Sequence, residues 1–218
     1  MVSRETPDLP RWLEQHRAEL LAFADILSSA GVERGLIGPR EVPRIWQRHL
    51  LNCAVVADPE GGLVPDGARV ADVGSGAGLP GVVWAIVRPG LHLVLVEPLL
   101  RRATFLAEAV NTLELGERVV VRRDRAEDVA RDREWVAADV VTARAVAPLE
   151  RLIGWTVPLL RPDGQLLALK GSNAAEEVDA ATDAAATAGL ADLRVEQLDA
   201  DYLDVPTTVI IGHRRAAE

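Results

Sequence analysis

With 218 residues, of which 49% are hydrophobic, the chain suits one domain with a modest extension, and it contains no membrane-spanning apolar stretch. Its net charge of −9 argues against the broad basic surface of a strong nucleic-acid binder. One cysteine, Cys53, excludes an internal disulfide, and four scattered histidines give no metal-ligand spacing, so we expect no metal ion.

The first eight residues lack the apolar core of a signal peptide, so we expect a cytoplasmic protein. Residues 9–30 then repeat apolar side chains at spacings of three and four, which predicts an amphipathic helix. A second helix is predicted from residue 42 or 43 to residue 56. We treat residues 1–58 as an N-terminal helical extension and residues 59–218 as one compact domain.

Basic residues lie along this second predicted helix and just before it. Arg40, Arg44 and Arg48 recur at a spacing of four, and His49 comes next. On an α-helix this spacing puts the three arginines on one face, offset from the apolar face. The stripe is either an ordinary solvated face or a set of phosphate contacts beside an active site.

A short apolar run at residues 69–73 ends in four glycines, Gly74, Gly76, Gly78 and Gly81. This pattern predicts a strand, a tight turn and a helix over residues 79–88. Glycine allows backbone angles that a side chain forbids, and it lets a ligand approach the main chain. We expect the amides at the start of the helix to face that ligand.

Two cofactor classes use such a turn. Residues 76–81 fit the G-x-G-x-x-G of dinucleotide binders, with Glu97 placed to accept ribose hydroxyls, which leaves a nicotinamide-dependent reductase as an alternative. Asp72, two residues before Gly74, would repel a pyrophosphate but could hold a cationic amino group. The resulting D-x-G-x-G-x-G resembles the first motif of S-adenosylmethionine-dependent methyltransferases, so we favour S-adenosylmethionine as the cofactor.

From residue 69 onward the pattern alternates between strands and helices, which indicates a parallel sheet covered on both faces. Strands are predicted at 69–73, 91–96, 118–122, 138–142, 164–170, 191–199 and 205–212. Helices are predicted at 79–88, 99–114, 126–131, 148–160 and 173–188. The last two strands have no helix between them, so they should pair antiparallel. We therefore predict an α/β, Rossmann-like class I methyltransferase fold with a mostly parallel seven-stranded sheet, an antiparallel last strand and N-terminal helices.

Ligands of such sheets lie at the carboxyl ends of the strands, so the residues after each strand are candidates. Ala126 and Glu127 follow the third strand, where they could meet an adenine or simply begin a helix. Arg144 follows the fourth, as a cofactor or substrate contact or as a structural ion pair. Lys170 follows the fifth and is the one lysine among 24 basic residues. A compact ammonium group is not equivalent to a guanidinium, so its position suggests a specific role.

Five stretches, spread over the chain from about residue 40 to residue 213, resemble one protein family. They are Arg48–Asn52, Asp72–Gly81, Arg125–Glu127, Arg144–Ala147 and Ala168–Gly171. Together they are similar to the RsmG (GidB) family of small-subunit ribosomal RNA guanine-N7 methyltransferases. One position departs from the family, since Asn52 stands where an aspartate is common.

The resemblance implies that the substrate is 16S ribosomal RNA, either free or in a small ribosomal subunit particle. It implies S-adenosylmethionine contacts at Gly74, Leu79, Ala126, Glu127 and Arg144. Guanine N7 has a lone pair and no proton, so no general base is needed. Arg144 and Lys170 would then orient the substrate, and we expect RNA contacts from the basic stripe and a monomeric enzyme.

The charge distribution leaves another substrate class open. Residues 173–204 hold nine acids and one base, Arg194, so the rest of the chain is nearly neutral. For a methyltransferase of a small molecule or a protein, or for a binding module without chemistry, this acidic segment would be the partner surface. For an RNA enzyme we expect modest, salt-sensitive affinity.

Overall fold

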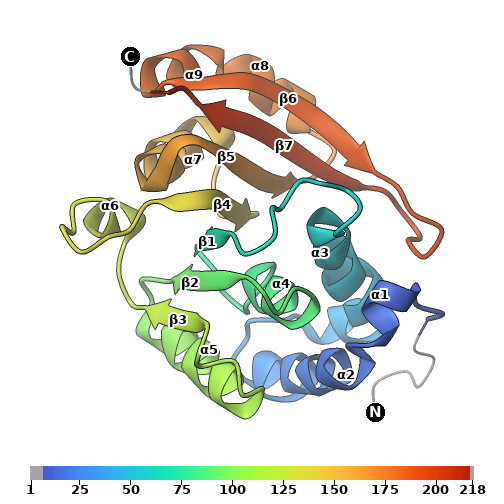
Figure 1. Cartoon of the computed structure of the whole chain (residues 1–218). Helices are drawn as coiled ribbons and strands as arrows, with labels where there is room; N and C mark the ends of the chain where they lie inside the picture. Colours follow the sequence, from blue (N-terminus) through green and yellow to red (C-terminus); the bar gives the residue numbers. More distant parts are fainter. Residues whose placement is uncertain (1–6, 217–218) are drawn as a thin grey trace.

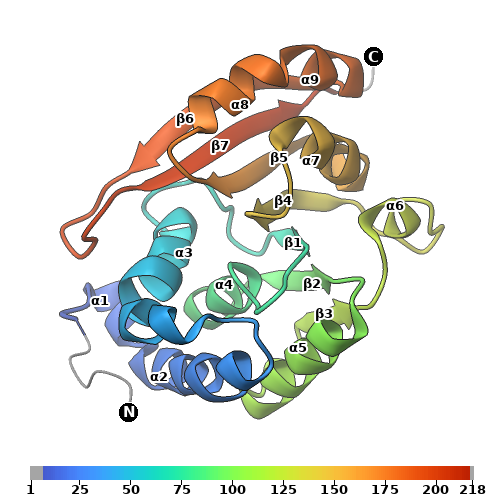
Figure 2. The same cartoon turned by 180° about the vertical axis from the view of Figure 1, so that it is seen from behind.

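In the computed structural model, which describes residues 7–216, a seven-stranded sheet lies between two layers of helices (Figures 1 and 2). The strand order is β3-β2-β1-β4-β5-β7-β6, and β7 runs antiparallel to both of its neighbours. This topology confirms the predicted sheet. Most of the N-terminal stretch on which we based the absence of a signal peptide lies outside the described residues.

The strands are β1 (Arg69–Val73), β2 (His92–Val96), β3 (Val119–Arg122), β4 (Ala138–Arg144), β5 (Leu160–Lys170), β6 (Leu190–Leu198) and β7 (Thr207–Arg214). The α-helices are α1 (Arg11–Glu14), α2 (Arg17–Ile26), α3 (Asn52–Ala54), α4 (Gly81–Val87), α5 (Leu100–Thr112), α6 (Ala126–Val129), α7 (Leu149–Thr156), α8 (Ala174–Ala180) and α9 (Thr182–Ala188). Within residues 7–216, π-helical or 3₁₀ segments complete the helical structure: η1 (Leu27–Gly31), η2 (Pro39–Arg44), η3 (Ile45–Leu51), η4 (Val55–Ala57) and η5 (Val157–Leu159).

Alternation along the strands produces two cores. Val70 of β1 points to the core formed with α2, α3, α4 and α5, whereas Ala71 and Val73 point to the core formed with α6, α7, α8 and α9. Both faces of the sheet are therefore covered, as the apolar runs predict for parallel strands.

The second predicted helix is not an α-helix throughout. It begins as the 3₁₀ segment η2, continues as the π-helical segment η3, and only Asn52–Ala54 is α-helical. Pro43 lies inside η2 and has no N–H to donate, which accounts for an irregular start. The i, i+4 argument for one face bearing Arg40, Arg44 and Arg48 therefore does not hold in its simple form.

Other element boundaries differ from the prediction. The first predicted helix is interrupted between α1 and α2, and the predicted helix at 173–188 is divided at Ala181 into α8 and α9. The predicted helix at 148–160 ends at Thr156, and β5 begins earlier than predicted. In addition, β4 continues to Arg144, which is therefore the last residue of the strand and not a loop residue.

The N-terminal helices share a core with the sheet domain. The indole Nε1 of buried Trp84 in α4 donates to the carbonyl oxygen of Cys53 (2.9 Å), and Nη1 of Arg88 donates to that of Ala57 (2.8 Å). The division at residue 58 stays a prediction. Among residues 7–216, no helix is long and apolar enough to span a membrane, and no group of three or more acidic, histidine or cysteine side chains could hold a metal ion.

Candidate active site

Three glycines shape the turn between β1 and α4. Gly74, Gly76 and Gly78 have φ angles of 70°, 55° and 87°, in the left-handed region where side chains are strained. At Gly78 a Cβ atom would also lie 2.6 Å from Cγ2 of Val82, in the first turn of α4. The backbone therefore requires glycine here, as the spacing predicts.

The amides of this turn already have partners within the protein. The N–H of Gly74 donates to the carbonyl oxygen of Val96 (2.8 Å), and that of Gly78 donates to a carbonyl of the turn itself (2.7 Å). The N–H of Gly81, the first residue of α4, donates to Oδ2 of Asp72 (3.0 Å). At the start of the helix the Gly81 amide is therefore already bonded within the protein, and contact between the amides of this region and a ligand stays a prediction.

Asp72 is completely buried beneath the start of α4. Its Oδ2 accepts the bond from Gly81, and its Oδ1 has no hydrogen-bond partner among the described residues. Burial raises the pKa of Asp72 to about 7, although the bond from Gly81 opposes this shift. A ligand reaches this carboxylate only if the turn above it moves, so direct contact between Asp72 and a cofactor stays a prediction.

The raised pKa of Asp72 predicts a pH-dependent stability. Between about pH 4 and pH 7 the native state keeps a proton that the unfolded chain, with an ordinary pKa of 3.8, has released. Raising the pH through this window should therefore lower the free energy of unfolding, on the order of a few kcal/mol. In Asp72→Asn, which cannot titrate, this part of the pH dependence should disappear. Urea unfolding at both ends of the window measures it, and parallel pH profiles for the two proteins would contradict it.

Glu97, at the end of the neighbouring strand, fixes the glycine turn. Its buried carboxylate accepts from the N–H of Gly76 through Oε2 (3.1 Å) and from the N–H of Leu99 through Oε1 (3.0 Å). Nη1 of Arg102 lies 4.0 Å from Oε2. Glu97 therefore joins the turn to the start of α5, while its role on ribose hydroxyls stays a prediction.

Three other residues that we predicted to contact the cofactor lie near this edge of the sheet. Ala126 and Glu127 begin α6 after β3, with Ala126 buried and Glu127 half-buried. Leu79 is buried between the turn and α4. No side-chain hydrogen bond of Glu127 occurs within residues 7–216, but its carboxylate lies in the first turn of α6, where negative charge is favourable. Contact of Leu79, Ala126 and Glu127 with a cofactor stays a prediction.

Arg144 joins the sheet to the N-terminal helices. Its Nη2 lies 2.6 Å from Nδ1 of His49 and donates to the carbonyl oxygen of Arg48 (3.2 Å). Its Nη1 donates to Sγ of Cys53 (3.2 Å). Arg144 and His49 are 95 residues apart in the sequence, so this cluster, which unites two predicted site residues, exists only in the folded chain.

The contact with Arg144 determines the state of His49. Its Nδ1 accepts from a guanidinium, so we assign the ring proton to Nε2, which lies 3.3 Å from Oε2 of Glu41 without hydrogen-bond geometry. Burial, followed by the charge of Arg144, lowers the pKa of His49 to about 4. The imidazole is therefore neutral near pH 7, and contact between His49 and RNA stays a prediction.

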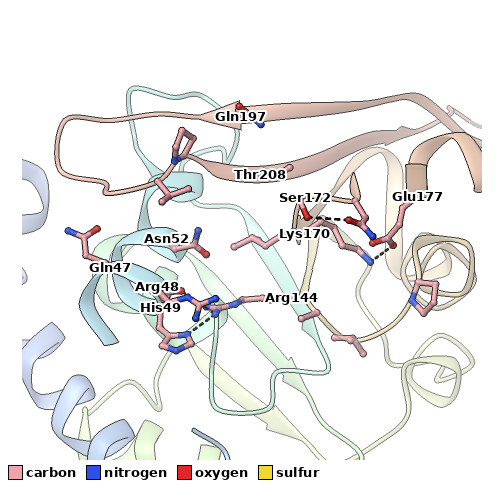
Figure 3. A pocket seen from close by; sticks show the side chains of 18 of the residues that line it. Gln47, Arg48, His49, Asn52, Arg144, Lys170, Ser172, Glu177, Gln197 and Thr208 are labelled. Atoms are coloured by element: carbon pink, nitrogen blue, oxygen red, sulfur yellow. Dashed lines mark hydrogen bonds and ion pairs between the residues drawn. The ribbon is translucent and has the colours of Figure 1, made fainter. Parts of the chain in front are cut away.

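A cavity of about 1310 Å³ opens beside Arg144, at the carboxyl ends of β4 and β5 (Figure 3). Five of the predicted residues line it: Arg44, Arg48, His49, Arg144 and Lys170. Arg40 is exposed and does not belong to the lining. The glycine turn is also absent from the lining, so the cavity lies beside the predicted cofactor site and not over it.

Lys170, the last residue of β5, supports the loop between β4 and α7. Its side chain is only 6% exposed, and its Nζ donates to the carbonyl oxygen of Ala147 (2.7 Å) and to Oε2 of Glu177 (2.6 Å). These protein groups use the ammonium that we predicted to orient the substrate. Direct contact between Lys170 and the substrate stays a prediction.

The family model for GidB, described as rRNA small subunit methyltransferase G, matches residues 16–204. The chain belongs to the GidB family. Ribosomal RNA small subunit methyltransferase G from Mycolicibacterium gilvum is 53% identical over 195 residues, which cover 89% of this chain and 83% of that protein. The protein of the same name from Nocardioides sp. is 53% identical over 214 residues, which cover 96% of this chain and 82% of that protein.

A solved structure shows the same fold at low sequence identity. The S-adenosylmethionine-dependent methyltransferase SibL has a TM-score of 0.61 at 18% identity, covering 92% of this chain and 70% of that one. Membership in the GidB family confirms the resemblance predicted from the five stretches, all of which lie within the matched residues.

The departure of this GidB-family chain at Asn52 has a structural explanation. Nδ2 of Asn52 donates to Oγ1 of Thr207 (2.7 Å), and that hydroxyl lies 3.2 Å from the carbonyl oxygen of Asn52, to which it donates. The pair ties α3 to the start of β7. An ionised aspartate side chain has no donor and could only accept from the Thr207 hydroxyl. The asparagine side chain instead donates to that hydroxyl, which leaves the hydroxyl proton free to bond to the Asn52 carbonyl oxygen.

Sequence reasoning missed two residues that hold the walls of this site. Nε2 of Gln47 donates to the carbonyl oxygen of Tyr202 (3.2 Å), and its Oε1 accepts from the N–H of Asp204 (3.1 Å), which holds the β6–β7 connection on η3. Glu177 supports the β4–α7 loop. The sequence signal for Gln47 was no more than a polar residue beside an apolar helix face.

Proposed function

We propose that this chain transfers a methyl group from S-adenosylmethionine to N7 of a guanine in 16S ribosomal RNA. The observation that carries the proposal is the buried carboxylate of Asp72 at the start of α4. This carboxylate accepts a hydrogen bond from the N–H of Gly81, and in a dinucleotide-binding turn such an N–H would face a phosphate. With Glu97 also beneath the turn, the site favours a cationic cofactor that lacks phosphate.

S-adenosylmethionine supplies a methyl group that is electrophilic because it is bonded to a positively charged sulfur. The glycine turn fits this ligand because no Cβ separates it from the main chain. The buried, unpartnered Oδ1 of Asp72 would accept from the ammonium group of the ligand once the turn above it moves aside. We assign cofactor binding to Asp72, Gly74, Gly76, Gly78, Leu79, Glu97, Ala126, Glu127 and Arg144.

The chemistry at the acceptor requires positioning and no proton transfer. Guanine N7 attacks with its own lone pair, so we assign no general base. Arg144 and Lys170 orient the substrate from the cavity wall, where their bonds to protein groups hold both cations in place. Placement of reacting atoms and exclusion of water can supply on the order of 7–11 kcal/mol of a barrier.

The cavity is suited to part of an RNA. Its volume of about 1310 Å³ exceeds the roughly 300–1,000 Å³ of small-ligand pockets. We propose RNA contacts at Arg40, Arg44, Arg48 and His49. Acidic side chains, Glu41 and Glu176 among them, share the rim, so binding should be modest and should weaken steeply with salt. The target guanine must be unpaired or turned outward to enter.

Two alternatives make different demands on the site. A nicotinamide-dependent reductase needs unoccupied amides for its pyrophosphate, and Asp72 already occupies that of Gly81. A methyltransferase of another substrate class would use the same cofactor site, with the acids of α8 facing a cationic substrate in the cavity. A transfer assay that compares the substrates therefore distinguishes these two classes of methyltransferase.

We expect S-adenosylhomocysteine to raise the melting temperature and NADH to leave it unchanged. A ligand at 100 times its dissociation constant adds about 2.7 kcal/mol of stability. The transfer assay should then use free small-subunit RNA and intact small-subunit particles, with mass spectrometry to detect 7-methylguanine. Stabilisation by NADH alone would contradict the cofactor, and methylation of neither RNA form would contradict the substrate.

The proposed substrate also implies a location and an assembly state. Ribosomal RNA is a cytoplasmic substrate, so we propose a cytoplasmic enzyme. We also propose that it acts as a monomer. Light scattering over a range of concentrations measures the assembly state.

A further inference from the structure

The loop between β4 and α7, residues 145–148, rests on the proposed cofactor site. Ala145 has a φ angle of 51°, in the left-handed region that is strained for a residue with a side chain. A Cβ atom on Gly74 would lie 2.8 Å from Cγ2 of Val146, so Val146 packs directly on the glycine turn. A shift of the loop therefore changes the packing on the turn, and the strained loop needs support.

Glu177 on α8 provides that support (Figure 3). Its Oε2 accepts from the N–H of Leu149 (2.8 Å) and from Nζ of Lys170 (2.6 Å), which itself donates to the carbonyl oxygen of Ala147 (2.7 Å). These bonds hold the loop on both sides of Pro148, which has no N–H. The carboxylate also lies at the start of α7, where an N–H lacks a helical acceptor and negative charge is favourable.

We propose that Glu177 is a positioning residue for methyl transfer. It sets the position of the 145–148 loop on the glycine turn, and through the loop it sets the alignment of a substrate held beside Arg144. This inference rests on the proposed function and deepens it. Within residues 7–216, the N–H of Leu149 donates to Oε2 of Glu177, and Lys170 is too buried for water to replace its partner readily.

The test compares Glu177→Ala with Glu177→Gln, which keeps a carbonyl acceptor for both donors. At saturating S-adenosylmethionine and RNA, we expect Glu177→Ala to lower the single-turnover rate by about 10- to 100-fold. Its affinity for S-adenosylhomocysteine should change little, and Glu177→Gln should recover most of the rate. Asp179→Asn is the matched control, since Asp179 is an exposed acid of α8 outside the cavity lining.

A second measurement does not depend on activity. In Glu177→Ala, the amide hydrogen of Leu149 should exchange with solvent faster, because it has lost its acceptor. Unchanged exchange at Leu149, or a wild-type transfer rate in Glu177→Ala, would overturn the proposal. If Glu177→Ala and Glu177→Gln lost the same fraction of the transfer rate and the same number of degrees of melting temperature, the proposal would be overturned as well. Failure of the wild-type protein to methylate RNA would instead refute the proposed function, while the exchange experiment would still decide whether Glu177 holds the loop.

Discussion

Replacement of Arg144 by alanine is expected to slow methyl transfer to small-subunit ribosomal RNA by about 100-fold, with the sheet still folded. The substitution removes the proposed substrate-orienting cation and the bonds to His49, Arg48 and Cys53. Buried His49 then lacks the donor to its Nδ1, which costs about 1–3 kcal/mol of stability. Single-turnover rates measure the first effect, and urea unfolding followed by circular dichroism measures the second.

Arg214 offers a matched control for this substitution. It is the last residue of β7, and its Nη1 donates to the carbonyl oxygens of Val157 and Leu160. These lie at the amino end of β5, whereas the cavity lies at the carboxyl end of that strand. Arg214→Ala should therefore lower stability without changing the transfer rate of the folded protein. A wild-type rate in Arg144→Ala would remove Arg144 from the site, and equal rate losses in the two variants would assign its effect to stability.

Gly81→Ala is expected to destabilise the protein by about 1–3 kcal/mol or more and to weaken binding of S-adenosylhomocysteine. The added Cβ would lie 2.6 Å from Oδ2 of Asp72 and 2.5 Å from Cδ2 of Leu95, both in the buried region beneath α4. The carboxylate of Asp72 would have to move and lose its hydrogen bond from the N–H of residue 81, and the glycine turn above it would shift. Urea unfolding and calorimetric titration measure the two effects.

Gly154→Ala applies the same chemical change where there is space. Gly154 lies inside α7, and a Cβ there would have no neighbour within 4 Å. Alanine in a helix interior should stabilise the protein by about 0.5–1 kcal/mol. Opposite signs for the two substitutions are therefore expected, and a Gly81→Ala protein as stable as the wild type would contradict the close packing around Asp72.

Several features of the fold could be predicted because they depend on local requirements. The apolar run at Val70, Ala71 and Val73 is buried on both faces, and the glycines that follow adopt backbone angles that other residues avoid. Two strands without an intervening helix must pair antiparallel, and β6 and β7 do so. The glycine turn also carried part of the family resemblance, so the class of protein could be predicted without knowledge of any tertiary contact.

Helix details were predicted less well. Propensity and spacing suggested one regular helix over residues 42–56 and another over 173–188, but the chain forms mixed helical segments in the first and breaks at Ala181 in the second. Such preferences are weak compared with tertiary packing. The placement of Arg40, Arg44 and Arg48 on one face depended on a regular α-helix, and in the structure Arg44 and Arg48 line the cavity while Arg40 does not.

By itself, the sequence determined the sheet, the glycine turn and the set of charged residues at the carboxyl ends of the strands. Only the tertiary structure decided what those charges contact: Arg144 bonds to His49, Lys170 bonds directly to the β4–α7 loop, and Asp72 is covered by α4. Strand and turn patterns arise from neighbours in the chain, which a sequence shows directly. Hydrogen-bond partners and burial depend on which distant segments cover a side chain, and no local periodicity records that.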